Sequence, residues 1–215
     1  MGRDKHPQER QREQLERKLE KRPSYDRILI VSEGSKTEPN YFYEIRRAYR
    51  LQMQVYPSRL GTAPIQVVQC AQALFFEQQR AFEKVYAVFD RDDHGSYHEA
   101  LALAESLDGE LKNDAEEPVV FQTIASVPSF ELWLLLHYED VRAPLPRKQV
   151  MQRLKKHFPG YDKGAPNAFA ITREHLPVAT RRAERLAKHS TAHTDPPEPF
   201  TAVFELVKLL TTLRR

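Results

Sequence analysis

The chain has 215 residues, 40% of them hydrophobic and 29% charged, a composition that supports a packed core and argues against wholesale disorder. Its formal charge is only +3, but the charges are segregated, because residues 28–146 carry a net −8 and residues 147–188 carry a net +8. A single cysteine excludes an internal disulfide framework. No apolar run forms a signal peptide or approaches the ~18 residues of a membrane span. We therefore expect a cytoplasmic protein without membrane contact.

Three regions are distinguished along the chain. Residues 1–25 form a charged N-terminal arm, in which only Leu15 and Leu19 are apolar between residues 7 and 22. In residues 26–140, short apolar runs alternate with helical patterns, which predicts an α/β fold with a parallel sheet flanked by helices. Strands are predicted at 28–31, 53–56, 85–89 and 119–124, and helices at 37–51, 63–80 and 96–112, with Thr37 as the N-cap of the first helix.

The C-terminal region is predicted to be mostly helical. After Ser129, the sequence F-E-L-W-L-L-L-H-Y indicates a short buried helix. Residues 141–215 then form a basic, mostly helical extension, interrupted by turns at 159–160 and 193–199, where prolines exclude a helix interior.

Acidic side chains follow two of the predicted strands. Glu33 comes at the end of the first strand, where Gly34 permits a tight turn, and Asp90 and Asp92 follow the strand at 85–89. Ligands of open α/β sheets bind outside the carboxyl ends of the strands. Alternation along an extended chain directs Asp90 and Asp92 to the same side. If the strands are neighbours, three carboxylates converge on one edge of the sheet.

Convergent carboxylates repel one another unless a cation neutralises them. A hard divalent ion, Mg²⁺ or Mn²⁺, is the natural partner of such oxygen ligands. It would stabilise charge on a phosphoryl oxygen and activate a water molecule. The alternative is that Glu33 and Asp92 are ordinary polar residues in turns. Strand-end carboxylates alone do not distinguish a nuclease from a phosphatase or a kinase-like site.

Three separated motifs make the resemblance to a known family specific. The sequence D-R-D-D-H-G at 90–95 matches the D-x-D-x-x-G motif of the Toprim domain. Topoisomerases, DnaG-type primases and OLD-family nucleases share this domain. V-S-E-G at 31–34 is similar to the glutamate motif that accompanies D-x-D-x-x-G in Toprim domains. Together with V-S-E-G-S-K-T-E-P-N-Y-F and S-V-P-S-F-E-L-W-L-L-L-H, these motifs resemble the RloB-like family, whose members occur beside bacterial restriction and phage-defence genes.

The resemblance implies a Toprim-like fold and metal-dependent cleavage of phosphodiester bonds. By motif, Glu33 would be the general acid/base or the first metal ligand, and Asp90 and Asp92 would be metal ligands. The resemblance also implies a role in phage defence by abortive infection. Relatives are often encoded beside an ATPase, which implies such a partner, and this chain has no G-x-x-x-x-G-K-[ST] loop of its own.

Four further residues are weaker candidates. Glu38 is either a supplementary metal ligand or a carboxylate that interacts with a helix N-terminus. Lys36 is either a phosphate contact or an exposed lysine in a turn. Glu131 lies in the most apolar part of the chain, where a carboxylate must be solvated, paired or metal-bound, so it is a candidate catalytic residue at a second metal site. Ser129 is a candidate helix cap that reaches the site.

The basic segment predicts a polyanionic partner, either DNA or RNA, tRNA included. Residues 147–188 hold eleven basic and three acidic residues, whereas solvated helix faces normally mix both signs. A solvated surface without a partner is the alternative. The residues predicted to contact nucleic acid, with Lys36, are Arg147, Lys148, Arg153, Lys155, Lys156, Arg181, Arg182 and Arg185.

Two classes of function therefore compete. The first is a Toprim-type endonuclease that binds Mg²⁺ between Glu33, Asp90 and Asp92. The second is a catalytically silent adaptor that binds nucleic acid or a partner ATPase. A phospho-accepting receiver-like domain also uses aspartates at strand ends, but its usual layout differs from D-x-D-x-x-G with an upstream E-G. Metal binding distinguishes the first two classes.

Overall fold

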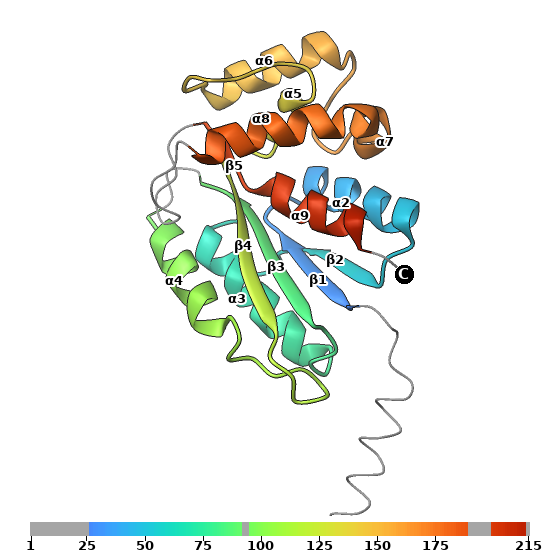
Figure 1. Cartoon of the computed structure of the whole chain (residues 1–215). Coiled ribbons are helices and arrows are strands. Elements are labelled where there is room, and N and C mark those ends of the chain that lie inside the picture. Colours follow the sequence, from blue (N-terminus) through green and yellow to red (C-terminus); the bar gives the residue numbers. More distant parts are fainter. Residues whose placement is uncertain (1–25, 92–94, 189–198, 214–215) are drawn as a thin grey trace, which may run out of the picture.

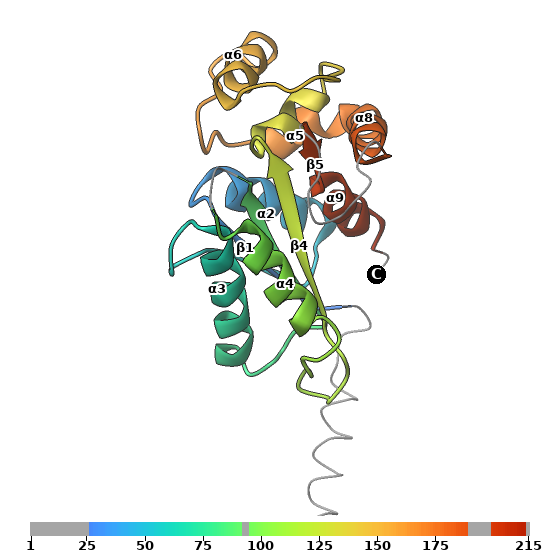
Figure 2. The ribbon, with the colours of Figure 1, turned by 90° about the vertical axis from the view of Figure 1, so that its left-hand side faces the viewer.

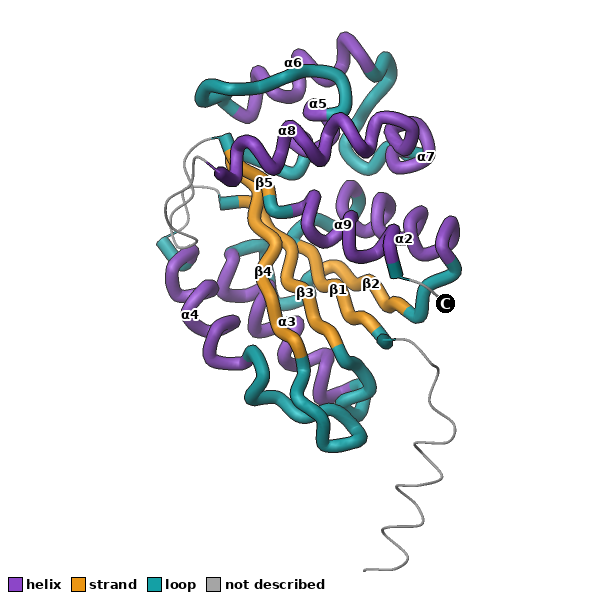
Figure 3. Tube along the Cα trace, viewed as in Figure 1, coloured by secondary structure: helices purple, strands orange, loops and turns teal. Residues whose placement is uncertain are grey.

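A central sheet organises the part of the chain that this computed structural model describes, residues 26–91, 95–188 and 199–213. Within these residues, five strands lie in the order β2 (Met53–Pro57), β1 (Ile28–Ser32), β3 (Lys84–Asp90), β4 (Val120–Val127) and β5 (Phe200–Thr201). The first four strands are parallel, and β5 is antiparallel to β4. Figure 3 shows the strands side by side in this order.

Helices cover both faces of the sheet and one of its ends. On one face lie α3 (Pro64–Glu77) and α4 (Tyr97–Leu107), and on the other lie α2 (Thr37–Tyr49) and α9 (Val203–Thr212) (Figures 1 and 2). Beyond the carboxyl ends of the strands lies a group formed by α5 (Glu131–Leu136), α6 (Arg147–His157), α7 (Ala168–Thr172), the 3₁₀ turn η1 (Arg173–His175) and α8 (Leu176–Lys188) (Figure 1).

Alternate strand residues supply two hydrophobic cores, one on each face of the sheet. Ile28 and Ile30 of β1 pack in the core with α2 and α9, whereas Leu29 and Val31 pack in the core with α3 and α4. All five residues of β1 are buried, which explains its unbroken apolar sequence, because a central parallel strand is covered on both faces. The predicted α/β class, a mostly parallel sheet flanked by helices, is confirmed and is consistent with a Toprim-like fold.

The strand order creates a switch point between β1 and β3. From β1 the chain crosses one face of the sheet through α2 to reach β2, and it then crosses the opposite face through α3 to reach β3. At such a point, the connections leave the strand ends in opposite directions and open a crevice that binds ligands in this class of fold. The prediction that β1 and β3 are parallel neighbours is confirmed, and Glu33 and Asp90 stand at their carboxyl ends.

The C-terminal region shares a core with the sheet. Residues of α5, α6, α7, α8 and α9 belong to the same hydrophobic cluster as Ile28 and Ile30. Strand β5 joins the sheet by pairing Thr201 with Ser126, whose hydroxyl oxygens are 2.9 Å apart. The predicted boundaries at residues 25 and 140 stay predictions, and the arm of residues 1–25 lies outside the described residues.

The region after residue 146 contains α6, α7, α8 and α9 and is mostly helical, and β5 adds a strand too short to show alternation in the sequence. Two local predictions were wrong. Helix α4 ends at Leu107 rather than near residue 112, since Gly109 has a positive φ of 73° and a loop leads to β4. Thr37 is the first residue of α2 and not its N-cap, and its hydroxyl accepts a hydrogen bond from the distant Gly164 N–H instead. Among the described helices, none is both long enough and apolar enough to span a membrane.

Candidate active site

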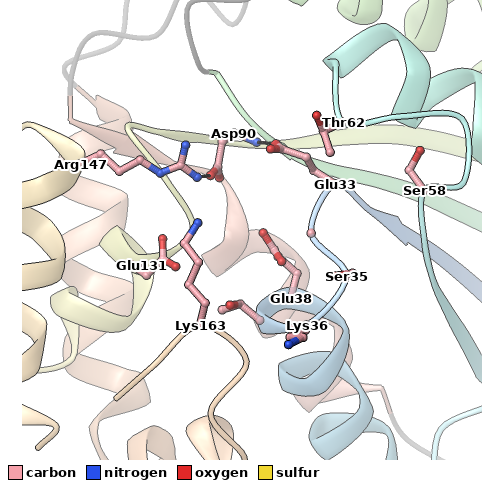
Figure 4. Close-up of a pocket in the computed structure, with 12 residues that line it drawn as sticks. Glu33, Ser35, Lys36, Glu38, Ser58, Thr62, Asp90, Glu131, Arg147 and Lys163 are labelled. Carbon is pink, nitrogen blue, oxygen red and sulfur yellow. Dashed lines mark hydrogen bonds and ion pairs between the residues drawn. The ribbon is translucent and has the colours of Figure 1, made fainter. Parts of the chain in front are cut away.

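A cavity of about 400 Å³ lies at the switch point, outside the carboxyl ends of β1 and β3. Its walls come from the turn after β1, the first turn of α2, the segment after β2, the end of β3, the first residues of α5 and α6, and the loop after α6 (Figure 4). The lining residues include four carboxylates and three cations: Glu33, Glu38, Asp90, Glu131, Lys36, Arg147 and Lys163.

Glu33 and Asp90, the two residues predicted at the strand ends, meet directly. The backbone N–H of Asp90 donates to Glu33 Oε2 at 2.9 Å, so the first carboxylate is held at the end of the neighbouring strand. The Asp90 side chain is only 3% exposed, and its Oδ1 accepts a hydrogen bond from the Phe130 N–H at 2.9 Å. The connection from β4 to α5 thus fixes the orientation of the second carboxylate.

Arg147 forms an ion pair with Asp90. Its Nη2 lies 2.6 Å from Asp90 Oδ2, and it is the first residue of α6, which follows β3 by more than fifty positions in the sequence. The sequence analysis predicted Arg147 as a contact to nucleic acid, but in the structure its guanidinium faces the acidic cavity (Figure 4). The basic extension therefore supplies a positive charge inside the site.

Glu38 is buried in the first turn of α2, where its carboxylate faces Gly34. It is 7% exposed, and a Cβ atom at residue 34 would lie 2.1 Å from Glu38 Oε2. Glycine at residue 34 therefore makes room for the Glu38 carboxylate as well as for the turn. The position of Glu38 in the cavity wall brings it together with Glu33 and Asp90, as expected of the supplementary ligand that the sequence analysis considered.

Glu131 begins α5 and is 3% exposed. Its Oε2 accepts a hydrogen bond from the Ser129 hydroxyl at 2.7 Å, so Ser129 supports the carboxylate and does not cap a backbone N–H of the helix. Glu131 lines the same cavity as Glu33 and Asp90, which explains how a carboxylate is accommodated in the most apolar stretch of the chain.

The cavity lowers the stability of the ionised carboxylates. Burial raises the pKa of Asp90 well above its ordinary value, the charges of Glu33 and Glu38 raise it further, and Arg147 opposes the shift. Burial likewise raises the pKa of Glu38 to about 7, with additional contributions from the charges of Glu131 and Glu33. These carboxylates lack sufficient positive charge around them, and a bound cation would supply it.

One buried hydroxyl of the cavity wall is left without a partner. Ser58 Oγ has no hydrogen-bond partner among the described residues, although it is shielded from solvent and lines the cavity. Buried polar atoms normally have a partner, and a ligand in the cavity would supply one for Ser58. Tyr161, in the loop after α6, is also buried, and its hydroxyl lies beside Thr37.

The donor set fits a hard divalent cation, since carboxylate and hydroxyl oxygens are the ligands that Mg²⁺ and Mn²⁺ prefer. Over residues 26–91, 95–188 and 199–213, no three side chains of His, Cys, Asp or Glu form a group that could hold a metal ion as they stand. Asp92, the third predicted ligand, lies outside the described residues together with Asp93 and His94. Glu33 and Asp90 are the two members of the predicted set that the structure brings together.

Four of the eight other members of the predicted nucleic-acid surface have partners within the protein. Arg153 pairs with Glu139, Lys155 lies 3.3 Å from Asp162, and Arg185 lies 3.0 Å from Asp140. The Arg182 guanidinium donates to the Leu136 carbonyl at the end of α5 at 2.7 Å. The exposed members for which no partner is found among the described residues are Lys148, Lys156 and Arg181. Lys36 lines the cavity.

The sequence analysis did not single out Ser58 and Lys163 as residues of the site. Ser58 follows β2, and Lys163 lies in the loop after α6, so the fold rather than a motif brings them to the cavity. The charge of Lys163 was noted only as part of the basic segment. The Y-D-K-G sequence at 161–164 is the one local signal, because a glycine beside a lysine permits a tight turn.

The fold and the cavity define a class: α/β proteins with a doubly wound sheet and an acidic ligand site at the switch point. The chain belongs to the RloB-like protein family, whose model matches residues 28–210. The match includes every described strand and every residue named above as lining the cavity, and it confirms the resemblance to the RloB-like family. No significant match to a curated protein or to a solved structure was found.

Proposed function

We propose that this protein is a metal-dependent endonuclease of the Toprim type, which hydrolyses phosphodiester bonds in DNA or RNA. The observation that carries the proposal is the convergence of Glu33, Glu38, Asp90 and Glu131 in one cavity at the switch point. Structural carboxylates are normally dispersed or paired one to one with cations, whereas this group faces inward and is partly desolvated. Such a set suits a site that receives cations and a phosphate group together.

In this proposal, Glu33, Asp90 and Asp92 hold Mg²⁺ or Mn²⁺, with Glu38 as a supplementary ligand. The ion, when bound, stabilises charge on a phosphoryl oxygen and lowers the pKa of a bound water. Hydrolysis joins the water oxygen to phosphorus and breaks one phosphorus–oxygen ester bond, so one proton leaves the water and one reaches the departing oxygen. Glu33 is the proposed general acid/base, and Ser129 and the Phe130 N–H keep Glu131 and Asp90 oriented.

The biological role is proposed from the family. We propose that the nuclease is the effector of a bacterial phage-defence system of the abortive-infection kind, acting in the cytoplasm with an ATPase encoded nearby. The net charge of +8 on residues 147–188 supports a polyanionic substrate. The exposed Lys148, Lys156 and Arg181 are the members of this segment best placed to contact a phosphate backbone from outside the cavity.

The test is cleavage of covalently closed circular DNA and circular single-stranded RNA, which only an endonuclease can open. Wild-type protein is expected to cleave at least one of them with Mg²⁺ or Mn²⁺ and neither with a chelator. Glu33→Gln and Asp90→Asn should each lose at least a hundredfold in rate while their melting temperatures stay close to that of the wild type. Glu99→Gln, an exposed residue of α4, is the matched control and should cleave normally.

A catalytically silent adaptor is the second candidate, and the Arg147–Asp90 ion pair favours it. The guanidinium 2.6 Å from Asp90 gives this carboxylate a counter-charge from the protein itself, at a position where a nuclease would place its metal ion. An adaptor of this kind would bind nucleic acid or an ATPase equally well with and without Mg²⁺, and it would leave both circular substrates intact. Those two results together would overturn the nuclease proposal.

A further inference from the structure

The loop between α6 and α7, residues 158–167, is anchored to the first turn of α2. The Gly164 N–H donates to Thr37 Oγ1 at 3.0 Å, and Asn40 Nδ2 donates to the Gly164 carbonyl at 2.9 Å. Gly164 has a positive φ of 84°, and a Cβ atom there would lie 2.5 Å from Lys36 Cβ. Only glycine permits this close approach, so the loop is held against a helix more than 120 positions away in the sequence.

The residue just before this anchor is Lys163, which lines the cavity. Figure 4 shows its side chain rising between Glu131 and Glu38 toward Asp90 and Arg147. Lys163 is exposed and makes no ion pair with the described residues. The cavity mouth thus carries an ammonium group that neither packing nor a salt bridge requires, on a backbone that is tightly fixed.

A second observation comes from the same loop. The Tyr161 side chain is 1% exposed, and its hydroxyl lies beside the Thr37 side chain in the first turn of α2. Thr37 therefore contacts both the Gly164 N–H and Tyr161, which fixes the backbone on each side of Lys163. The loop thus presents one ammonium group, from a rigid backbone, toward an otherwise acidic cavity.

We propose that Lys163 binds the substrate phosphate in the acidic cavity, and that the anchor between Gly164 and α2 positions it for this contact. The inference rests on the proposed function and names the residue that recognises the phosphodiester. The carboxylates repel a polyanion, so a phosphate can enter only where positive charge offsets them. Arg147 is engaged with Asp90, whereas Lys163 has no carboxylate partner in the described chain and can approach a phosphate oxygen as a point charge.

The test measures binding separately from cleavage. All variants carry Glu33→Gln, and the affinity for a labelled single-stranded oligonucleotide is measured by fluorescence anisotropy with Mn²⁺ over a range of salt concentrations. Adding Lys163→Gln should weaken binding about tenfold and reduce the slope of log affinity against log salt by about 0.7, the value for one contact to a single strand. Lys112→Gln, an exposed lysine in the loop before β4, is the matched control and should change neither quantity.

A variant of the anchor tests positioning. Gly164→Ala retains the lysine but forces the loop away from Lys36, and it should lose part of the same affinity. Mn²⁺ affinity should not fall in Lys163→Gln, because the Lys163 charge acts on Glu38 and its removal leaves the cavity more attractive to a cation. Equal oligonucleotide affinity and equal salt slope in Lys163→Gln and its parent would overturn the inference, as would a parallel loss of Mn²⁺ affinity. Failure of the nuclease proposal would be seen separately, as an absence of cleavage by the wild type.

Discussion

Replacement of Arg147 by alanine is expected to destabilise the protein in a way that a metal ion reverses. The guanidinium lies 2.6 Å from an Asp90 carboxylate that is 3% exposed, while the Arg147 side chain itself is 34% exposed. Removal of one partner of a fully buried pair costs about 3–5 kcal/mol, and the solvent around Arg147 reduces this to about 2 kcal/mol. For a chain of this length, the corresponding drop in melting temperature is roughly 4–8 °C.

A divalent cation at the same carboxylates would take over the role of the guanidinium. At a metal concentration about a hundred times the dissociation constant, binding adds about 2.7 kcal/mol to stability. Because Arg147 no longer competes for Asp90, the variant should also bind Mn²⁺ more tightly than the wild type, by roughly tenfold for a difference of about 1.4 kcal/mol. The difference in melting temperature between Arg147→Ala and the wild type should therefore shrink as Mg²⁺ or Mn²⁺ is added.

The assay is thermal unfolding followed by circular dichroism, in a chelator and across a metal titration, with Mn²⁺ affinity measured by calorimetry. Arg153→Ala is the matched control, since Arg153 lies on the same helix and pairs with Glu139 rather than with a cavity residue. The Arg153→Ala variant should have a lower melting temperature than the wild type, and added metal should not reduce this difference. A deficit in Arg147→Ala that is the same with and without saturating metal would refute the reasoning, and so would an unchanged Mn²⁺ affinity.

Three further predictions concern other parts of the molecule. Burial lowers the pKa of His137 from 6.5 to about 4. The free energy of unfolding should therefore be highest above pH 6.5 and fall by about 3 kcal/mol as the pH drops to 4. Urea unfolding of His137→Gln should lack this part of the pH dependence. Arg27→Met leaves Glu83 and Asp114 facing each other without the guanidinium that lies 2.7 Å from both, and urea unfolding should show a loss of about 2 kcal/mol. Gly34→Ala displaces the Glu38 carboxylate, and calorimetry should show weaker Mn²⁺ binding with a loss of stability of about 1–3 kcal/mol.

The sheet could be predicted from the sequence because its central strands are buried on both faces. Short unbroken apolar runs such as 28–31 and 85–89 are typical of parallel strands that are covered on both faces. The acidic residues that follow these runs then lie at the edge of the sheet where the carboxyl ends of the strands meet. β5 could not be predicted, because two residues cannot show a period, and its place in the sheet depends on the pairing of Thr201 with Ser126 and of Phe200 with Val127. Thr37 looked like a cap by local rules, but a tertiary hydrogen bond from Gly164 takes its hydroxyl.

The site was predictable where it depends on strand ends and not where it depends on tertiary packing. Glu33 and Asp90 follow from local sequence, and their meeting follows from the pairing of β1 with β3. Lys163 comes from a loop whose position is fixed by contacts with α2, which no local pattern announces. The charge of the basic segment was evident from the sequence, but its ion pairs, such as Arg153 with Glu139 and Arg185 with Asp140, are visible only in three dimensions, and its contact with nucleic acid stays a prediction.

The shared core of the sheet and the C-terminal helices has a consequence for synthesis on the ribosome. Chains emerge from the N-terminus, so β1 and β3 leave the ribosome long before α9, which covers the same sheet face as α2. Until residues of α9 arrive, Ile28 and Ile30 lack part of their packing, and until the loop after α6 arrives, the cavity lacks one wall. The walls of the cavity are therefore complete only when the chain has been made as far as Lys163, and a translation product that stops earlier would not carry them.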